Sequence, residues 1–558
     1  MEIHVNELPP PILPPNILVG VDIEWHGLPD NQLHRPGGKF AALSICTDDV
    51  NSYVITDINL VDLALGRIED CVWCFHKSLF DLVHLRTIRE IPPRSRLWDT
   101  LLIERILWNG LYNEFSLADC ARRYLDIKMD KDLQKSFKIV SELTDEQIEY
   151  AAKDAWIGRQ VAVEQSMIIS PEQFKHWREI DGPCVWAILD FCGMHLDKEK
   201  WIALAEKNKE REAAIDATLS FNPRSPKQVK EFFKNELDIK LKTTGVEALE
   251  KLKDTVGWEW AEKILESRTY GKRASTYGLK FVEDFAETDE HGQSWIFADF
   301  NPIGAETFRM SCRKPNMQNQ PTRDTLEFRE CYTAPLGYKM IVADWKSQEP
   351  RITAEITQDP RLKQIFTEGK DVYVVMEELS VSMGYGDPGR KSMKDIFLGM
   401  TYGLTEWGYA KRYGVPKKEA AEFLEAGHRM FPVVSDVMEQ FGKQRKKVTT
   451  LTGRTIWLNP YAQQVENNGR NSPIQSVASD QMKLSIVRLW KQQMKDYGKC
   501  FIAAPIHDEL VLIVPEELAE KVAKEVEHTM STVAQEICPS IEFPVDVIIC
   551  DNWAEGKG

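Results

Sequence analysis

Two strand-like segments that lie far apart in the sequence end on acidic side chains, and they constrain the fold more than any other feature. YKMIVADW (338–345) ends close to Asp344, and FIAAPIHDELVLIVP (501–515) has the pattern of two strands joined by a tight turn at 507–509. The stretch between them, from about 360 to 430, has helical periodicity. The pattern predicts one sheet interrupted by a helical excursion, with acids gathered at its rim.

The length of the chain predicts more than one domain. At 558 residues it is several times longer than a typical domain of ~100 to 200 residues. From about 16 to 170 strand-like runs alternate with helical ones, whereas 172–300 is largely helical and rich in charges of both signs. The proline-rich start, LPPPILPP, predicts an extended lead-in, with the first ordered element near Asn16.

Composition limits the class of protein. No run approaches the ~18 uninterrupted apolar residues of a membrane span, which predicts a cytoplasmic protein with no membrane association. The net charge of -16 argues at first sight against nucleic acid, but phosphoryl-transfer enzymes need clustered carboxylates beside local basic patches, so local arrangement decides. Cys71 and Cys74 lie in an apolar run that predicts a buried strand rather than a metal site.

Two acids end the first long apolar run of the chain. In NILVGVDIEWHG, Asp22 and Glu24 are two positions apart, so both side chains leave the same face of a strand. Two carboxylates on one face repel unless a positive charge lies between them, and a divalent metal is the simplest candidate. For this fragment alone, a pair of surface acids remains the alternative.

Two further acids follow in the same half of the chain. Asp81 follows the apolar run CVWCF, near the predicted start of a helix, and Asp154 lies in LTDEQIEYAAKDAW. Thr144 and Gln147 have the spacing of a capping box at the start of that second helix. Tyr150 and Asp154 are four residues apart, so a phenol and a carboxylate share one helical face. Singly each acid is typical of a solvated surface, but together they favour one metal site.

The signatures DIE, FD and YxxxD, in this order, resemble the 3'-5' exonucleases with four acidic ligands and a tyrosine, which have a ribonuclease H-like fold. The resemblance covers roughly residues 16–165. It implies that Tyr150 orients the attacking water of an in-line displacement. It also implies that two metals are held by Asp22, Glu24, Asp81 and Asp154.

Between the two strand segments lies a candidate nucleotide-binding helix. GRKSMKDIFLGMTYG spaces Arg390, Lys394, Leu398 and Tyr402 by four, a slowly winding stripe on one helical face. Two cations, an apolar residue and an aromatic could meet the phosphates, the sugar and the base of one nucleotide. An amphipathic surface helix is the alternative for this segment alone, and the acidic motifs on either side argue against it.

All three segments, in this order, resemble motifs A, B and C of the family A DNA polymerases. Agreement extends to FRMSCRKPNMQNQP, to RNSPIQSVASD and to DNWAEG near the end of the chain. The implied fold is α/β and multidomain, a ribonuclease H-like exonuclease domain (1–170) followed by a right-hand polymerase domain (171–558). The implied subdomains are a thumb at about 190–290, a palm at about 291–350 and 431–558, and fingers at about 351–430.

The resemblance also implies a role for each matching residue. Asp344 and Asp508 bind the catalytic metals, and Glu509 supports that site. Arg390 and Lys394 hold the triphosphate, with Lys394 placed to protonate the leaving pyrophosphate. The implied cofactor is Mg²⁺, two ions per active site, with Mn²⁺ as a substitute.

Further roles concern the sugar, the base and the DNA. Glu349 matches a sugar gate, a carboxylate that excludes a ribose 2'-hydroxyl, so the expected substrate is a deoxynucleotide. Tyr402 borders the base pair being formed. The residues expected to contact the primer-template near its terminus are Arg309, Asn471, Gln475 and His507. Candidate phosphate-binding patches are GKQRKK, SPKQVKEFFK and TYGKRAS.

Three positions depart from the family pattern. Lys77 stands where the exonucleases usually have Asn, Leu398 where Phe or Tyr is common, and Asn467 where a basic residue is common. These departures bear on nuclease rate and strand preference, on sugar selectivity and on template grip, while the metal ligands are intact.

The predicted function is template-directed DNA synthesis with proofreading, in DNA replication, by a monomer that binds primer-template DNA, deoxynucleoside triphosphates and other replisome proteins. Single-subunit RNA polymerases share the same logic, but Glu349 and the attached nuclease argue against them. A second alternative is an active nuclease whose polymerase half only binds DNA, which would leave the intact polymerase acids without a function. A third is a non-catalytic scaffold, which would leave both sets of acids without one. The chain lacks room for a 5' nuclease domain ahead of the exonuclease, and this compactness resembles a bacteriophage replicative enzyme in its host's cytoplasm, with a bacterial origin as the alternative.

Overall fold

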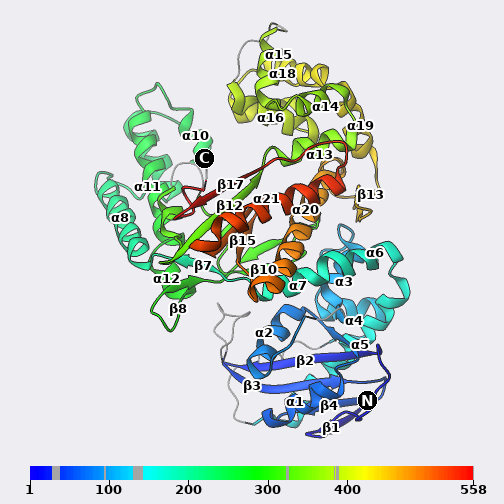
Figure 1. The fold of residues 1–558 in the computed structure, drawn as a ribbon. Helices are drawn as coiled ribbons and strands as arrows, with labels where there is room; N and C mark the ends of the chain where they lie inside the picture. Colours follow the sequence, from blue (N-terminus) through cyan, green and yellow to red (C-terminus); the bar gives the residue numbers. More distant parts are fainter. Residues whose placement is uncertain are drawn as a thin grey trace. The chain divides into compact units, whose positions relative to one another are not determined.

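The computed structural model describes residues 1–27, 38–93, 96–129, 142–321, 326–382, 384 and 389–556. The chain forms two compact units (Figure 1). The segments of the larger unit are Met1–Cys192, Asp299–Gln318 and Ile341–Ile548. Those of the smaller unit are Gly193–Ala298, Asn319–Met340 and Ile549–Gly558. The chain therefore leaves the larger unit and returns to it twice.

The larger unit begins with a six-stranded sheet in the order β1-β4-β3-β2-β5-β6. Its strands are β1 (Glu2–Val5), β2 (Leu18–His26), β3 (Lys39–Cys46), β4 (Asn51–Ile55), β5 (Val72–Phe75) and β6 (Leu97–Asp99). Neighbours in sequence among β2, β3 and β4 pair antiparallel, while β2–β5, β5–β6 and β1–β4 pair parallel. Parallel neighbours need crossover connections, and a helix lies on those that join β2 to β5 and β5 to β6. The helices are α1 (Ile58–Arg67), α2 (Ser78–Ile88), α3 (Thr100–Trp108), α4 (Leu117–Leu125) and α5 (Asp145–Ile168).

Strand β1 corrects one prediction, because the first ordered element begins at Glu2 and not near Asn16. β1 pairs parallel with β4 at the edge of the sheet, and the Glu2 amide donates to Val50 O at 2.6 Å. Asn6 then fixes the exit, since its side-chain oxygen accepts from the Thr56 amide at 2.8 Å. With four residues, EIHV, followed by a proline-rich run, β1 is too short for its alternation to stand out as a strand.

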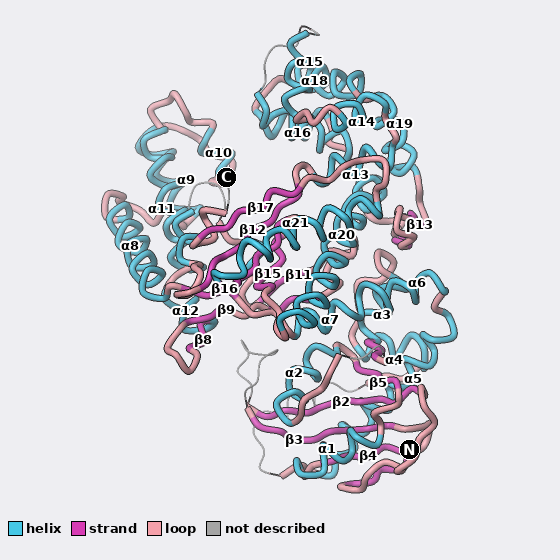
Figure 2. Tube along the Cα trace, in the orientation of Figure 1, coloured by secondary structure: helices cyan, strands magenta, loops and turns pink. Residues whose placement is uncertain are grey.

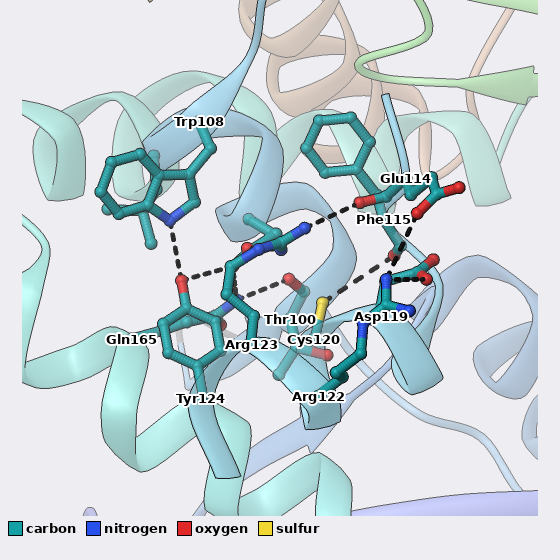
Figure 3. Close-up of polar contacts among 12 residues, drawn as sticks. Thr100, Trp108, Glu114, Phe115, Asp119, Cys120, Arg122, Arg123, Tyr124 and Gln165 are labelled. Atoms are coloured by element: carbon teal, nitrogen blue, oxygen red, sulfur yellow. Dashed lines mark hydrogen bonds and ion pairs between the residues drawn. The ribbon is translucent and has the colours of Figure 1, made fainter. Parts of the chain in front are cut away.

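A buried polar network ties α3 and α4 to α5 (Figure 3). Glu104 of α3 is fully buried and accepts from the Tyr124 hydroxyl at 2.7 Å and from Gln165 Nε2 at 2.8 Å. It also pairs with Arg123 of α4, and the Trp108 indole donates to the Tyr124 hydroxyl at 2.8 Å. A satisfied network of this kind fixes one arrangement of its helices. It therefore holds α5, which carries two of the predicted nuclease residues.

The second part of the larger unit contains a four-stranded sheet in the order β15-β16-β12-β17 (Figure 2). The strands are β12 (Tyr338–Trp345), β15 (Ile502–Ile506), β16 (Glu509–Pro515) and β17 (Val545–Cys550). The chain between β12 and β15 is largely helical, which confirms the predicted excursion. Its helices are α13 (Gln348–Thr357), α14 (Pro360–Thr367), α15 (Val372–Ser382), α16 (Gly389–Tyr402), α17 (Glu406–Tyr413), α18 (Lys417–Met430), α19 (Pro432–Lys443) and α20 (Val465–Tyr497). Helix α21 (Ala519–Ile537) follows β16 and packs beside α20.

Two acids and two cations form a buried cluster inside the larger unit. Asp181 accepts from Arg454 Nη1 at 2.8 Å and from Lys483 Nζ at 2.6 Å, and Asp480 accepts from Arg454 Nε at 2.8 Å. The four side chains are at most 1% exposed. Their charges balance, so each partner is needed by the others.

Replacing Asp181 by Ala is expected to lower the free energy of unfolding by about 3–5 kcal/mol, because Lys483 would lose its partner, Arg454 would keep only Asp480, and the buried cluster would carry an uncompensated positive charge. Burial alone would raise the pKa of Asp181, but the two cations lower it below its usual range, so this stabilisation is present at neutral pH and lost in acid. Chemical denaturation measures the change. Glu439→Ala, which removes an exposed partner of Lys443, is the control and should cost under ~1 kcal/mol. Equal effects of the two substitutions would contradict the cluster's importance.

The nuclease-like part contacts a hairpin formed by β13 (Lys447–Thr449) and β14 (Thr455–Trp457). The Trp457 amide donates to Asn109 O at 3.0 Å, and its indole donates to Leu107 O at 2.8 Å. The side chain of Asn109 donates to Ala305 O at 2.9 Å and Glu306 O at 3.0 Å. At Gly110, which has φ +87°, a Cβ would overlap the backbone of Trp457. Backbone-to-backbone contact therefore joins these parts of the larger unit.

The smaller unit has its own core and a three-stranded sheet in the order β7-β9-β8. Its main helices are α8 (Lys198–Asp216), α9 (Pro226–Leu237), α10 (Val246–Glu250), α11 (Trp258–Thr276) and α12 (Leu279–Phe285), and its strands are β7 (Met194–Leu196), β8 (Ala286–Thr288) and β9 (Ser294–Ile296). Val229, Phe233 and Ile264 are fully buried in the core between these helices. A second cluster centres on Trp201, whose ring stacks on Phe281 at 4.4 Å. The largely helical pattern predicted for this region is confirmed.

Two expectations from composition concern burial and membranes. Cys71 and Cys74 are both buried, as predicted for an apolar run that packs as a strand. Among the residues that the structure describes, no helix is both long enough and apolar enough to cross a membrane.

Candidate active sites

The four predicted nuclease acids converge at one end of the first sheet. Asp22 and Glu24 lie on β2 and Asp154 on α5, and one carboxylate oxygen of each lies within 4.8 Å of the others. Asp81, in the first turn of α2, joins them because its Oδ1 accepts from the amide of Ile23 at 3.1 Å. The alternation of side chains along a strand explains why Asp22 and Glu24 lie on one face. The tertiary fold brings Asp81 and Asp154 to them.

A glycine brings β2 and α5 close enough for this convergence. A Cβ at Gly20 would overlap the carbonyl oxygen of Ala155, so the strand and the helix touch backbone to backbone there. Gly20 lies two residues before Asp22, and Ala155 directly follows Asp154. The missing side chain therefore sets the separation of the two carboxylates.

Tyr150 lies beside the acids, as its spacing predicted. Its hydroxyl donates a hydrogen bond to Asp154, one helical turn later on α5. The predicted capping box is present, because Thr144 Oγ1 accepts from the Gln147 amide at 3.3 Å and Gln147 Oε1 accepts from the Thr144 amide at 3.0 Å. The start of α5 is thereby fixed one and a half turns before Tyr150.

The electrostatics of the cluster fit a divalent cation. Burial and then the charge of Asp154 raise the pKa of Asp22 to about 8, and burial raises the pKa of Asp154 to about 6. The pKa values of Glu24 and Asp81 are raised for the same reason, by burial first and by neighbouring carboxylates second. Asp154 Oδ1 is buried and has no hydrogen-bond donor among the described residues. Hard oxygen ligands that repel one another are the donor set of Mg²⁺ or Mn²⁺.

Lys77 caps α2 in a conformation that lysine rarely adopts. Its φ is 78° and its ψ 58°, in the left-handed region, and its amide donates to Asp99 Oδ1 at 3.3 Å. Burial and then Arg313 lower the pKa of its ammonium, while Asp299 and Asp81 raise it. This half-buried cation therefore lies in the electrostatic field of the nuclease acids, and no local sequence pattern indicated its backbone strain.

On the polymerase side, Glu349 is held at both carboxylate oxygens. Arg309 Nη2 donates to Oε1 and the Tyr402 hydroxyl donates to Oε2. Glu349 lies in the first turn of α13, whereas Tyr402 ends α16. Burial and then Glu349 raise the pKa of Tyr402 far above its usual range, so the phenol stays the donor. Three residues with separately predicted roles thus form one hydrogen-bonded group.

A cavity of about 320 Å³ adjoins this group. Six of the predicted site residues line it, namely Arg309, Glu349, Lys394, Leu398, His507 and Asp508. Lys394 and Leu398 come from α16, one turn apart, and Asp508 comes from the turn between β15 and β16. The cavity therefore gathers residues from segments that are up to 200 positions apart in sequence.

Other predicted polymerase residues lie outside the lining of this cavity. Asp344 is half-buried near the end of β12, and Glu509 is buried at the start of β16, the neighbouring strand. Arg390 pairs with Asp371 at 2.7 Å and lies over the Tyr373 ring. To bind the triphosphate as predicted, Arg390 would have to leave the Asp371 carboxylate and pair with a phosphate.

Three of the residues predicted to contact DNA lie in the turn before β16 and on α20. His507 is exposed, with φ 59°, and its Nε2 lies 3.0 Å from Gln318 O. Asn471 and Gln475 are half-buried on α20, and Asn471 Oδ1 has no hydrogen-bond partner among the described residues. An unmet acceptor here leaves room for a ligand's donor.

Sequence analysis missed several residues that line the cavity. Tyr373 of α15 and Met482 of α20 lie in ordinary amphipathic helices, so no local signal singled them out. Gln348 was also missed, although it stands beside Glu349 and donates to Gln481 at 2.9 Å. In that turn the sequence pattern indicated a role only for the neighbouring acid, Glu349.

Comparison with known protein families decides the class of this chain. The family model described as DNA polymerase family A matches residues 196–555, more than half of the chain. The chain belongs to this family. A second model, described as 3'-5' exonuclease, matches residues 13–164. Divalent metal dependence comes with both families, which agrees with the carboxylate cluster.

Curated relatives of this family A chain include bacterial enzymes named DNA polymerase I. DNA polymerase I of Pseudomonas aeruginosa is 28% identical over 83% of this chain and 54% of its own length. The chain thus spans about half the length of that relative. DNA polymerase I of Aquifex aeolicus is 25% identical over 91% of this chain and 92% of its own length. A bacteriophage origin stays a prediction.

A solved structure shares the fold of the family A chain over its whole length. It is titled the POL domain of Pol1 from M. smegmatis in complex with DNA primer-template and dNTP. It is 21% identical, with a TM-score of 0.81, and the match covers 97% of this chain and 96% of that one. The α/β multidomain fold, with an exonuclease-like part followed by a polymerase-like part, is confirmed. The subdomain boundaries stay predictions.

Leu398→Tyr is expected to relax discrimination against chain terminators by ~1 to 3 kcal/mol, about 5- to 150-fold. Leu398 lines the cavity near Glu349, so a tyrosine hydroxyl has room to replace a polar contact that a dideoxy sugar lacks. Competition between dideoxy- and deoxynucleotides on one primed template measures the ratio, with Asp22→Ala and Glu24→Ala added so that excision cannot mask incorporation. Leu398→Phe is the control, because it adds the ring without the hydroxyl. An unchanged ratio in an active Leu398→Tyr enzyme would show that this residue is not beside the incoming sugar.

Proposed function

We propose that this chain is a template-directed DNA polymerase that adds deoxynucleotides to a primer 3' end and removes mispaired ends with its own 3'-5' exonuclease. The observation that carries the proposal is that the chain matches both family models and has a separate set of acidic residues in the part that matches each one. The cavity with Lys394, Glu349 and Asp508 supports a nucleotide site. The cluster of Asp22, Glu24 and Asp154 supports a nuclease site.

In the polymerase site each residue has a distinct task. Lys394 is exposed at the cavity, where its ammonium can bind the triphosphate and protonate the leaving pyrophosphate. Arg390 adds a second cation once it is released from Asp371. Glu349, held by Arg309 and Tyr402, presents a fixed carboxylate toward the sugar. The primer-template would be held by Asn471, Gln475, His507 and Arg309.

In the nuclease site Tyr150 and Asp154 act together. The tyrosine hydroxyl, fixed by its hydrogen bond to Asp154, can orient a water toward the terminal phosphodiester. Divalent cations, proposed to be two Mg²⁺ in each site, would promote deprotonation of the nucleophile and stabilise charge on the leaving oxygen. Asp22, Glu24, Asp81 and Asp154 would hold them in the nuclease, and Asp344 and Asp508 in the polymerase.

Primer extension tests the proposal directly. A labelled primer annealed to a longer template should lengthen when Mg²⁺ and all four deoxynucleotides are present, and a single-stranded end should shorten when nucleotides are withheld. We propose that the active species is a monomer, which gel filtration on the same sample would check. Absence of extension by folded protein, with or without Mn²⁺, would refute the polymerase assignment.

Glu349→Ala is expected to raise the ratio of ribo- to deoxynucleotide incorporation by about 10- to 100-fold, with some loss of overall rate. The carboxylate that would clash with a 2'-hydroxyl is removed, and Arg309 and Tyr402 lose their common partner. Single-nucleotide incorporation kinetics with each sugar give the ratio. Tyr402→Phe, which keeps the carboxylate and loses one of its donors, should leave the ratio close to that of the natural enzyme. If the ratio is unchanged in Glu349→Ala, Glu349 is not the sugar gate, and the hypothesis of a single-subunit RNA polymerase regains support.

A further inference from the structure

Arg470 lies between the ends of two helices that carry glycine there. It belongs to the second turn of α20, and its side chain runs over Gly442, in the last turn of α19, and on to Gly403, just after α16. A Cβ at Gly442 would lie 2.6 Å from Arg470 Nε, and one at Gly403, with φ +81°, would lie 2.6 Å from Nη1. Any side chain at either glycine would displace the guanidinium, so the glycines make room for this cation.

The guanidinium has no protein partner in the part of the chain that the structure describes. Arg470 Nε is buried and donates no hydrogen bond, and no acid of the described residues forms an ion pair with the group. Glu439 lies within the field of Arg470 but already pairs with Lys443 at 2.6 Å. A half-buried cation with five N–H donors and no acceptor is costly, and an unmet donor set of this kind points to a ligand.

The surroundings of Arg470 favour an anionic ligand. Lys443, Arg445, Lys446 and Lys447 are all exposed just beyond Gly442, in a chain whose net charge is -16. Of these four, Lys443 pairs with Glu439 and Arg445 with Glu466, each at 2.6 Å. The side chain of Asn467 also reaches Gly403, since a Cβ there would lie 2.5 Å from its Oδ1. Cations outnumber acids around the two glycines, and one amide adds a further polar group.

We infer that Arg470 binds a backbone phosphate of the DNA that the polymerase site holds, an inference that rests on the proposed function. A guanidinium offers parallel N–H donors that match a phosphate, and glycine allows a strand to come close to the backbone. The triphosphate of the nucleotide is the other source of phosphate. Its proposed partners, Arg390 and Lys394, lie 13 and 9 residues before Gly403, about 20 Å and 14 Å along α16. A nucleotide held at those residues would have its phosphates far from Arg470, so we assign the phosphate to a DNA strand and not to the nucleotide.

The competing explanation is structural. A cation beside the carboxyl ends of α16 and α19 also stabilises the helix dipoles, by about 0.3–1 kcal/mol each. Such a role predicts a loss of thermal stability without any change in DNA binding. The two explanations therefore differ in the salt dependence of binding, because each phosphate contact that is formed releases condensed counterions.

The test is the equilibrium binding of a labelled primer-template, without nucleotide, across a series of salt concentrations. Arg470→Gln should weaken binding to every sequence and reduce the slope of log K against log salt by about 0.9. Adding Asn467→Arg to Arg470→Gln should restore the slope, because residue 467 reaches the same glycine. Lys495→Gln is the matched control, since it removes an exposed cation from the last turn of the same helix, about 38 Å away, and should leave the slope unchanged.

Three outcomes would overturn the inference. The first is an unchanged slope with an unchanged KM for nucleotide in folded Arg470→Gln protein, whatever its melting temperature, and a lowered melting temperature would then favour the structural explanation. The second is an unchanged slope together with a raised KM for nucleotide, which would assign the phosphate to the triphosphate. If Arg470→Gln does not fold, Arg470→Met is measured instead, because it keeps the length of the side chain without the charge, and a salt slope equal to that of the natural protein would be the third. Failure of the proposed function looks different, because the natural protein would then neither bind primer-template nor extend it.

Discussion

Asp508→Ala is expected to lower primer extension by about 10³-fold or more while the degradation of single-stranded 3' ends continues at nearly the natural rate. Asp508 borders the cavity that holds Lys394 and Glu349, and its loss removes a proposed metal ligand, worth on the order of 4 kcal/mol or more in the transition state. Asp344→Ala should behave in the same way, because β12 and β16 are neighbours in one sheet. Rapid-quench measurement of a single incorporation gives the rate free of product release.

The matched control is Asp546→Ala, which removes an exposed acid from β17 of the same sheet. Asp546 pairs only with Lys346 among the described residues, at 2.7 Å, so its loss should leave both activities intact. Simultaneous loss of synthesis and degradation in Asp508→Ala protein would overturn the separation into two sites. Equal loss in Asp508→Ala and Asp546→Ala would show a general effect on the sheet.

Asp22→Ala combined with Glu24→Ala is expected to abolish 3'-end degradation, by about 10³-fold or more, and to spare synthesis. Both residues lie on β2 and share their cluster with Asp154, so the double change removes two of the four proposed metal ligands of the nuclease site without touching the cavity. The measurement is the release of mononucleotides from a labelled single strand. A matched control is Asp62→Ala, which removes an exposed acid from α1.

A second measurement does not depend on activity. Millimolar Mg²⁺ should raise the melting temperature of the natural protein after treatment with a chelator, because a cation relieves repulsion among buried carboxylates and binds only the folded state. The double variant should lose part of this rise and the Asp62→Ala control should keep it. An equal rise in all three proteins would place the bound metal elsewhere.

Local periodicity predicted much of the nuclease site. The alternation of a strand placed Asp22 and Glu24 on one face, and the four-residue spacing on α5 placed Tyr150 beside Asp154. The helical excursion between β12 and β15 also followed from pattern alone. In each case the residues that interact are close in sequence, or belong to one regular element, so the pattern contains the geometry.

Contacts between distant segments could not be predicted in this way. Nothing in the neighbourhood of Gly20 indicates that the backbone of Ala155 will touch it, and nothing near Glu349 indicates that both of its oxygens will be taken. The pairing of Asp181 with Arg454 joins residues 273 positions apart. The short strand β1 lacked an apolar run because an edge strand is stabilised by backbone hydrogen bonds. Such features depend on tertiary packing, which overrides local propensity.

The join at Asn109 and Trp457 limits how this enzyme can be recombined with its relatives. The backbone and indole of Trp457 and the side chain of Asn109 bond across the two parts, and Gly110 admits no larger residue. A chimera that imports a foreign nuclease must therefore also import a matching hairpin, or it will expose a tryptophan and leave four polar groups unsatisfied. The nuclease-like and polymerase-like parts would then be exchanged between relatives together, and not one at a time.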